Sequence, residues 1–521
     1  MRTRLLSLAS LSLVTACVGL QLQGCSSDAT PDSPVADPST TSAASVGCIH
    51  EDPIAEDGYT EFAKVDASKV TRKRLDATGA LIDDPEKLST PSDEDLGRAM
   101  KKIAAYTSRI NAEIPASARR RERYSAAHRG EAFEPYCLFH KAGQATYGTV
   151  VLFHGFNDRP YQQAKLASYL FHAGFNVYNA FLATMTTNEG TKSWPKTTYR
   201  PEVLATVQGK LQNPANVATL QPILPRIQSG ALTDQDLLAI DGVLAPELSI
   251  ANLKNAWTHP GGDDFKKLFN FHEPKANESL YDTAKQADFL QYVRDAKERL
   301  DDLADIPGPM FVGGLSVGGA LAVALAETDG GRRVRGVMSH APWFQSLEPK
   351  NNLQIMLGGP LDENATMIGA PYPIVWENHQ IPMSPANIAA NLALGAWSAM
   401  PANVATLARI PTAFITTDAE DSADNVATGK LLGALQSDPR VAALHVAANY
   451  PANLNVGHAL TDPENYTADK WNHFYRTLYQ ESFRFYTTGT VSQKNLVSKA
   501  QDDALPKASC VLADFPGRCN E

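Results

Sequence analysis

The 521-residue sequence lacks several features that would place it in common functional classes. Asp and Glu outnumber Lys and Arg, 57 to 47, so no basic surplus attracts the chain to a nucleic acid and we expect no nucleic-acid partner. No segment is apolar over the roughly 20 residues that span a bilayer. No HExxH motif and no paired Cys/His spacing occurs, so we expect neither a metal nor a cofactor.

The first 24 residues have the composition of a secretion signal, because Arg2 and Arg4 precede a weakly apolar stretch without charge. Residues 25–47 contain no aromatic and no basic residue, so they cannot bury enough apolar surface to fold. We therefore expect a signal peptide at 1–24 and a disordered tether at 25–47. Removal of the signal takes the net charge from −10 to −12, because its two arginines are its only charged residues.

The junction between signal and tether, Leu-Gln-Gly-Cys at 22–25, resembles the lipobox of bacterial lipoproteins. The resemblance implies cleavage before Cys25 and a lipid on that cysteine, which would attach the protein to a membrane. Ser26 resembles the sorting signal of Gram-negative lipoproteins for the outer membrane, so we expect an exported protein at that membrane, at the cell surface or on its periplasmic face. An ordinary signal peptide that happens to contain a cysteine is the alternative.

Four cysteines remain when Cys17 and Cys25 are set aside, and four in an exported chain indicate two disulfides. Cys510 and Cys519 bracket a short loop with Pro and Gly. We therefore favour a Cys510–Cys519 bond, which leaves a Cys48–Cys137 bond, although the other two pairings stay open.

The pattern of apolar and polar residues changes near residue 135. Upstream, residues 92–114 space apolar side chains by three, four and seven, which predicts an amphipathic helix in an N-terminal extension, 48–134. Downstream, short runs rich in Val, Ile and Phe alternate with helical patterns, which predicts a mostly parallel sheet with helices on both faces. The predicted strands are Thr149–Phe153, Phe175–Tyr178, Pro309–Val312, Val334–Met338, Thr412–Thr416 and Ala443–Val446. The predicted helices are Pro160–His172, Ala284–Leu303, Val317–Glu327 and Asp469–Tyr486.

A Gly-Leu-Ser-Val-Gly pentapeptide joins one of these strands to an Ala/Leu-rich helix in PMFVGGLSVGGALAVALAE, residues 309–327. A serine in a strained turn between strand and helix needs small neighbours, and Gly314 and Gly318 supply them. The setting predicts a nucleophile elbow that presents Ser316 at the carboxyl edge of the sheet. A glycine-rich structural turn is the alternative.

A nucleophilic serine needs a base and donors for the oxyanion. His458 lies in the glycine-containing loop NVGHALTDPENY, between a late strand and the last long helix, and we expect it to be the base; His445 falls in an apolar run and His473 in a helix. We expect the oxyanion donors to be the N–H groups of Val317, directly after the serine, and of Phe156. The latter follows His154-Gly155 in the turn after TVVLF.

Three segments, VVLFHGFNDRPYQQAKLASYLFHAGFNVY, GGLSVGGALA and NVGHA, resemble the α/β-hydrolase superfamily, in particular its monoacylglycerol-lipase-like and serine-aminopeptidase-like branch of esterases and lipases. The resemblance covers roughly 145–185, 284–345 and 408–486. It implies the α/β-hydrolase fold and a triad acid between Ser316 and His458 in the chain. The stretch PTAFITTDAEDSADN offers four carboxylates beyond a strand, Asp418, Glu420, Asp421 and Asp424. The family's usual placement favours Asp421, with Asp418 second and Asp424 third.

This fold would place a catalytic domain at 135–490, with an insertion at about 187–280, a cap or lid at about 342–408, and a C-terminal tail with a possible disulfide at 491–521. Ser316, His458 and Asp421 would cleave carboxylic esters through an acyl-enzyme, and the Met- and Trp-rich cap suits the acyl chain of a small-molecule ester or lipid. A serine peptidase or acyltransferase on the same fold, or a non-catalytic binding lipoprotein, is the alternative.

Overall fold

The structure is a computed structural model of the chain, and it describes most of the segments in which sheet and helices were expected. The described residues are 64–76, 78–113, 135–156, 158, 160–182, 195, 197–228, 232–247, 269–270, 289–347, 372–373, 380–381, 385–463 and 470–505. The predicted signal, tether and lipid site, together with Cys48, Cys510 and Cys519, lie outside these ranges.

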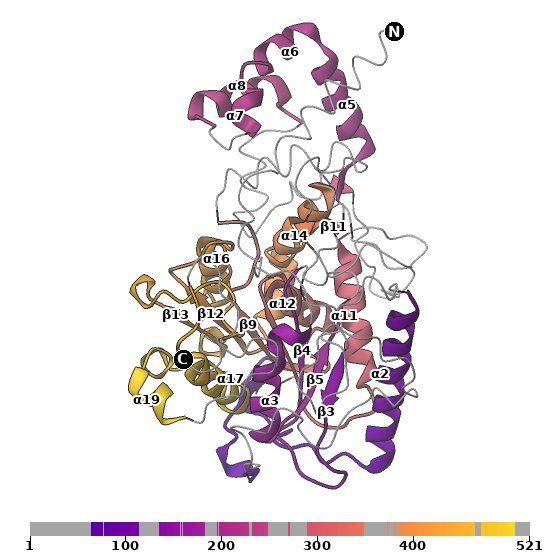
Figure 1. Cartoon of the computed structure of the whole chain (residues 1–521), viewed down its shortest axis with the longest axis vertical. Helices are drawn as coiled ribbons and strands as arrows, with labels where there is room; N and C mark the ends of the chain where they lie inside the picture. Colours follow the sequence, from indigo (N-terminus) through magenta and orange to yellow (C-terminus); the bar gives the residue numbers. More distant parts are fainter. Residues whose placement is uncertain are drawn as a thin grey trace, which may run out of the picture.

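A seven-stranded sheet with the order β13-β12-β9-β8-β4-β5-β3 forms the centre of the molecule (Figure 1). Its strands are β3 (Tyr136–Leu138), β4 (Thr149–Phe153), β5 (Asn176–Ala180), β8 (Met310–Leu315), β9 (Val334–His340), β12 (Thr412–Thr417) and β13 (His445–Tyr450). All pairs are parallel except β3 with β5. The predicted mostly parallel sheet is confirmed, and each of the six predicted strands is present, β4 with the predicted bounds and the others with shifted ends. The short antiparallel edge strand β3 was not predicted.

Helices cover both faces of this sheet, as predicted. One face carries α3 (Ala164–His172), which continues from the 3-10 turn η5 (Pro160–Gln163), and α17 (Tyr475–Thr488). The other carries α11 (Leu290–Asp302) and α12 (Val317–Asp329). Successive side chains of a strand point to opposite faces. Val150 and Leu152 of β4 accordingly join the hydrophobic cluster under α3 and α17, whereas Val151 and Phe153 join the cluster under α11 and α12.

The predicted N-terminal extension contributes helix α2 (Asp93–Glu113) and a short hairpin, β1 (Lys73–Leu75) with β2 (Leu81–Asp83), after the turn η3 (Ala67–Lys69). Helix α2 packs beside α11, and Arg98 and Lys102 pair with Asp305 just beyond α11. Arg72 is buried, contacts Asp84 at 3.1 Å and donates to the carbonyl of Tyr486 in α17 at 2.9 Å. The extension is therefore attached to the sheet domain at two places.

The predicted insertion contains four short helices that form a lobe at the top of Figure 1, away from the sheet. They are α5 (Pro201–Gln212), α6 (Pro214–Leu220), α7 (Leu224–Gln228) and α8 (Asp234–Leu244), and a two-residue ladder of β6 (Thr198–Tyr199) with β7 (Phe269–Asn270) lies at their base. The predicted cap contains β10 (Tyr372–Pro373), β11 (Gln380–Ile381), α14 (Pro385–Ser398) and α15 (Pro401–Leu407). Helices α14 and α15 both pack on α12.

One heptapeptide, PANVATL, occurs twice, as α6 and as α15. Proline at the first turn suits a helix start, where its missing N–H has no intrahelical acceptor. In α15 both Val404 and Leu407 are buried, whereas in α6 Leu220 is buried and Val217 is 42% exposed. The same local sequence therefore forms the same helix in two places, but only the copy against α12 buries both apolar side chains.

The remaining elements follow the cap. They are α16 (Asn425–Leu435), the turns η8 (Ala442–Leu444) and η9 (Ala452–Leu454), α18 (Gln493–Leu496) and α19 (Lys499–Ala504). Cys137 on β3 is disulfide-bonded, and its partner lies outside the described residues, so the Cys48–Cys137 pairing stays a prediction. Within the described part of the chain, no helix combines the length and apolarity that crossing a membrane requires.

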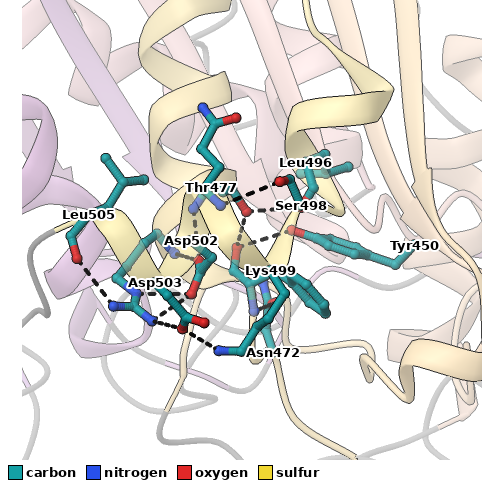
Figure 2. A network of polar contacts seen from close by, with 12 residues as sticks. Tyr450, Asn472, Thr477, Leu496, Ser498, Lys499, Asp502, Asp503 and Leu505 are labelled. Atoms are coloured by element: carbon teal, nitrogen blue, oxygen red, sulfur yellow. Dashed lines mark hydrogen bonds and ion pairs between the residues drawn. The ribbon is translucent and has the colours of Figure 1, made fainter.

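The described part of the predicted C-terminal tail packs against α17 through a buried carboxylate, shown in Figure 2. Asp502 is fully buried and accepts the backbone N–H groups of Arg476 and Thr477, in the first turn of α17, at 3.1 Å each. The Arg476 guanidinium lies 2.6 Å from the same carboxylate. Thr477 in turn donates to the carbonyl of Leu496 at 2.9 Å. A carboxylate at a helix N-terminus stabilises the helix dipole and its unpaired N–H groups.

We expect Asp502→Asn to lower the free energy of unfolding by about 3 kcal/mol, because it leaves the buried Arg476 guanidinium without its buried charged partner. Asp503→Asn is the matched control, since Asp503 is 55% exposed and its contact with the same guanidinium is 3.4 Å long. Chemical denaturation should show a loss below about 1 kcal/mol for that control. Equal losses for the two variants would contradict the role given to Asp502.

Candidate active site

Ser316 occupies a sharp turn between β8 and α12, as the pentapeptide predicts. Its backbone angles are φ 59° and ψ −126°, a conformation that costs a non-glycine residue about 1–3 kcal/mol. Its N–H donates to the carbonyl of His340 at 3.0 Å. Its own carbonyl accepts from Gly319, Ala320 and Trp343 at 3.0–3.1 Å. The strained turn is therefore held by hydrogen bonds on both sides of the residue.

The glycines around the serine allow backbone contacts that no other residue permits. A Cβ on Gly314 would collide with the backbone of Gly318 and Gly319. A Cβ on Gly318 would collide with the carbonyls of Phe153 and His154, where β4 ends. Both glycines of the pentapeptide are thus required, one within the turn and one between the turn and the neighbouring strand.

The loop after β4 lies against the serine. A Cβ added to Gly155 would lie 3.5 Å from the Cβ of Ser316. The Gly155 N–H donates to Gln162 Oε1 at 2.8 Å. His154 is fully buried; its Nε2 accepts from the Leu182 N–H at 3.0 Å, and its Nδ1 lies 2.8 Å from the Gly155 carbonyl. His154 therefore supports this loop through hydrogen bonds and takes no part in acid–base chemistry in this arrangement.

His458 and an acid meet in the loops after β13 and β12. Nδ1 of His458 lies 2.8 Å from Oε1 of Glu420, and both side chains are almost completely buried. Glu420 Oε1 also accepts the backbone N–H groups of residues 421–423 at 2.9–3.1 Å. The predicted partner of His458 was Asp421, and the structure instead brings Glu420 into contact with the ring.

The electrostatics of this pair follow from burial and charge. Burial alone would lower the pKa of His458, but the Glu420 carboxylate more than offsets it, and the pKa lies above its ordinary value. Burial alone would raise the pKa of Glu420, yet the charge of His458 and the backbone donors bring it below the ordinary value. Each charge of the pair therefore stabilises the other.

The other carboxylates of the cluster have different surroundings. Asp421 Oδ1 accepts from the Ser422 hydroxyl at 2.9 Å, its Oδ2 lies 3.9 Å from Lys470 Nζ, and burial raises its pKa. Asp418 is exposed. Asp424 caps the start of α16 by accepting the N–H of Val426 at 2.7 Å. No hydrogen bond or ion pair described in the structure joins any of the three to the His458 ring, although the charge of Asp421 also raises the pKa of His458.

The histidine loop is held by hydrogen bonds from three elements. The hydroxyl of Thr417, the last residue of β12, donates to the Val456 carbonyl at 2.6 Å. The amide of Asn472 donates to the Leu460 carbonyl at 2.7 Å, and the Tyr479 hydroxyl of α17 donates to that of Thr461 at 2.8 Å. The loop is thus held both before and after His458 in the sequence, which fixes the position of its ring.

The serine, the loop containing His154, the acid and the histidine all follow the carboxyl ends of parallel strands, so they meet at one edge of the sheet, where ligands bind in open α/β sheets. The strand–serine–helix turn stands at the middle of that edge. The chain has the α/β-hydrolase fold. In that fold the acid and the histidine follow the serine in the chain, as Glu420 and His458 do here.

Comparisons with known proteins find only distant similarity. No protein-family model and no curated protein sequence matches the chain. Among solved structures, a monoacylglycerol lipase from Paleococcus ferrophilus is 13% identical, with 66% of this chain and 95% of that chain covered and a TM-score of 0.34. A soluble variant of monoglyceride lipase from Saccharomyces cerevisiae is 11% identical, with 67% and 88% covered and a TM-score of 0.35. Naproxen esterase from Bacillus subtilis is 10% identical, with 71% and 93% covered and a TM-score of 0.28.

Two other described histidines of the C-terminal half have structural surroundings. His445 lies buried in β13 with Nε2 3.1 Å from the Ala408 carbonyl, and burial lowers its pKa to about 4. His340 ends β9 with Nε2 3.2 Å from the Ser482 hydroxyl, and burial lowers its pKa to about 4 as well. Among the described residues, no group of three or more His, Cys, Asp or Glu side chains is placed to hold a metal ion.

We expect Gly318→Ala to destroy the elbow, because the added methyl meets the carbonyls at the end of β4. The free energy of unfolding should fall by about 3 kcal/mol or more, and the reactivity of Ser316 toward a fluorophosphonate should be lost. Gly429→Ala in α16 is the control, since a Cβ there meets nothing within 4 Å and alanine favours the helix. If Gly318→Ala keeps wild-type stability and reactivity, the close approach is not required.

Proposed function

We propose that this protein is a serine hydrolase that cleaves carboxylic esters through an acyl-enzyme, with Ser316 as nucleophile, His458 as base and Glu420 as the acid that orients the base. The observation that carries the proposal is the buried contact of Glu420 with His458 at the sheet edge where the strained elbow presents Ser316. Glu420 replaces the acid expected from the sequence, Asp421.

The chemistry follows from these positions. Ser316 Oγ attacks the ester carbonyl carbon while its proton passes to Nε2 of His458, and a tetrahedral oxyanion forms. Collapse of this intermediate breaks the bond to the leaving oxygen, which takes the proton from His458 and departs as an alcohol. Water then repeats the sequence on the acyl-enzyme and releases the acid. Glu420 holds Nδ1 of the ring and stabilises the imidazolium that exists in both halves.

The oxyanion donors in this proposal are the N–H groups of Val317 and Phe156. Val317 is the first residue of α12, so helix geometry gives its N–H no intrahelical acceptor, and the positive end of the helix lies at the serine. Phe156 belongs to the loop that contacts Ser316 through Gly155, whose own N–H is bonded to Gln162. Two preorganised donors of this kind stabilise a tetrahedral intermediate.

An ester is proposed over an amide because an alkoxide leaves more readily than an amine, which must be protonated first. The apolar cap was expected to favour acyl chains. Trp397 and Met400 are buried in the hydrophobic core, and Met356, Met367, Trp376 and Met383 lie outside the described residues. The substrate class within the esters, a small-molecule ester or a lipid, stays open in the proposal.

We also propose that the protein is exported and attached to the outer membrane through a lipid on Cys25, with no nucleic acid as partner. The support is the sequence alone: the resemblance of residues 22–25 to a lipobox, the uncharged stretch before them and the unfolded composition of the tether.

Labelling with a fluorophosphonate tests the nucleophile and the location together. We expect the full chain to label in the membrane fraction of the cells that express it, and Ser316→Ala not to label. Equal labelling of wild type and variant would remove Ser316 from the mechanism, and labelled protein only in the soluble fraction would remove the anchor. Purified protein should then hydrolyse p-nitrophenyl esters in preference to aminoacyl amides; activity on amides alone would favour the peptidase.

Replacing each carboxylate by its amide shows whether Glu420 or Asp421 is the acid that orients His458. Because Glu420 stabilises the imidazolium, Glu420→Gln should lower kcat/KM by about 10⁴-fold and move the acid limb of its pH profile to lower pH. Asp421→Asn should move the limb in the same direction but leave most of the rate, since Asp421 acts on His458 only through its charge.

Asp418→Asn is the surface control and should leave both the rate and the profile in place. If Asp421→Asn lowers kcat/KM more than Glu420→Gln does, Asp421 is the acid, as expected from the sequence, and Glu420 has no catalytic role.

A further inference from the structure

A short segment after β9 contacts three parts of the site at once, and the mechanism above does not use it. The segment is Trp343–Leu347, which begins where the predicted cap begins. Trp343 and Phe344 are 5% exposed each, and Gln345 is 2% exposed. Nothing in its sequence marks it as functional, since it carries no motif and no residue that ionises.

Trp343 joins the nucleophile to the acid loop. Its backbone N–H donates to the carbonyl of Ser316 at 3.0 Å, and its indole Nε1–H donates to the carbonyl of Ser422 at 3.0 Å. Ser422 lies in the turn whose N–H groups converge on Glu420 Oε1. A single residue therefore connects the strained residue of the elbow, through its backbone N–H, to the turn that presents the acid, through its indole.

The residues that follow continue the connection along the acid loop. Ser346 and Ala423 form an antiparallel bridge, and the Leu347 N–H donates to the Ser422 carbonyl at 3.0 Å. The backbone N–H of Asp424 donates to the Gln345 carbonyl at 3.0 Å, and the Gln345 amide donates in turn to the Asp424 carboxylate. The acid loop is thus paired with this segment almost as a strand is paired in a sheet.

The cap packs against the same segment. A Cβ on Gly395 of α14 would collide with the backbone of Phe344, so this helix of the cap packs directly on the segment. Phe344 in turn packs its ring against Phe414 of β12, with centroids 6.2 Å apart. The segment is therefore held between the cap, the sheet and the acid loop.

We propose that Trp343 is a positioning residue of the esterase site: its two hydrogen bonds keep the acid loop in register with the elbow, so that Glu420 meets His458 beside Ser316. This inference rests on the proposed function. Trp343 acts through the backbone of Ser422 and makes no contact with substrate in this scheme.

The physical case depends on how the acid loop is otherwise held. Another attachment of this loop is Lys470, whose ammonium donates to the Ala419 carbonyl at 2.7 Å and whose Cβ lies beside Gly457, next to the catalytic histidine. That attachment holds the acid loop to the histidine loop. Trp343 supplies the attachment to the serine, and a displacement of about 1 Å at such a site costs about 10²-fold in rate.

Trp343→Phe tests the inference, because it keeps an aromatic ring and removes the indole donor. We expect the second-order rate of fluorophosphonate labelling to fall about tenfold, as the loss of one positioning hydrogen bond predicts. The acid limb of the pH–rate profile should also move to lower pH, because Glu420 would stabilise the His458 imidazolium less well. Asp421 and Lys470, the other charged groups near this pair, are unchanged by the substitution.

Trp397→Phe in α14 is the matched control for the loss of ring volume, since Trp397 is 6% exposed and its ring has no contact with the acid loop among those described. It should cost comparable stability in chemical denaturation and leave the acid limb in place. If both Trp→Phe variants change the pH profile alike, or if Trp343→Phe labels at the wild-type rate, Trp343 has no positioning role.

A second variant keeps the inference testable if Trp343→Phe fails to fold. Gln345→Met removes only the amide that donates to Asp424 and retains the length of the side chain. We expect a smaller loss of labelling rate with the same direction of pH shift, and an unchanged profile would contradict the role of the segment. Normal labelling of Ser316→Ala would refute the proposed function, whatever Trp343→Phe does. Labelling of Trp343→Phe at the wild-type rate, with Ser316→Ala unlabelled, would refute this inference alone.

Discussion

The close approach of three backbone segments at the elbow is the constraint on which the site depends. The end of β8, the first turn of α12 and the end of β4 meet at distances that only Gly314 and Gly318 allow. The strain at Ser316 persists because its surroundings leave it no room to relax: β9 accepts its N–H, and α12 and Trp343 donate to its carbonyl. Helix α12 is buried along almost its whole length and cannot shift to relieve that strain.

The proposed catalytic acid and base, Glu420 and His458, are arranged around this fixed point. A buried carboxylate facing a buried imidazole is costly unless both are further satisfied. Three backbone N–H groups of its own turn satisfy Glu420, and the loops that carry both residues are bonded to the segment after β9, to β12 and to α17 through Trp343, Thr417 and Tyr479. The acid and the base therefore gain their geometry from their own loops and from the elements that hold those loops in place.

Much of this architecture could be predicted from the sequence because the central strands are buried on both faces. Val150, Val151 and Leu152 read as a continuous apolar run, and such runs identify parallel strands. The edge strand β3 gave no such signal, since it has only three residues and exists through pairing with β5. Likewise the heptapeptide PANVATL forms a helix in both places where it occurs. Its sequence does not tell that α15 buries Val404 while α6 exposes Val217.

The identity of the acid could not be predicted for a related reason. Four carboxylates lie within seven residues of a loop, where no periodicity tells which way a side chain points. Asp424 could have been set aside, because a short acidic residue at a helix start is an N-cap. Glu420 and Asp421 are neighbours, and the turn decides between them: its N–H groups converge on the longer side chain, which folds back over them and still reaches His458. That turn exists because the segment after β9 pairs with it, a contact between residues about 80 positions apart in the chain that no local pattern contains.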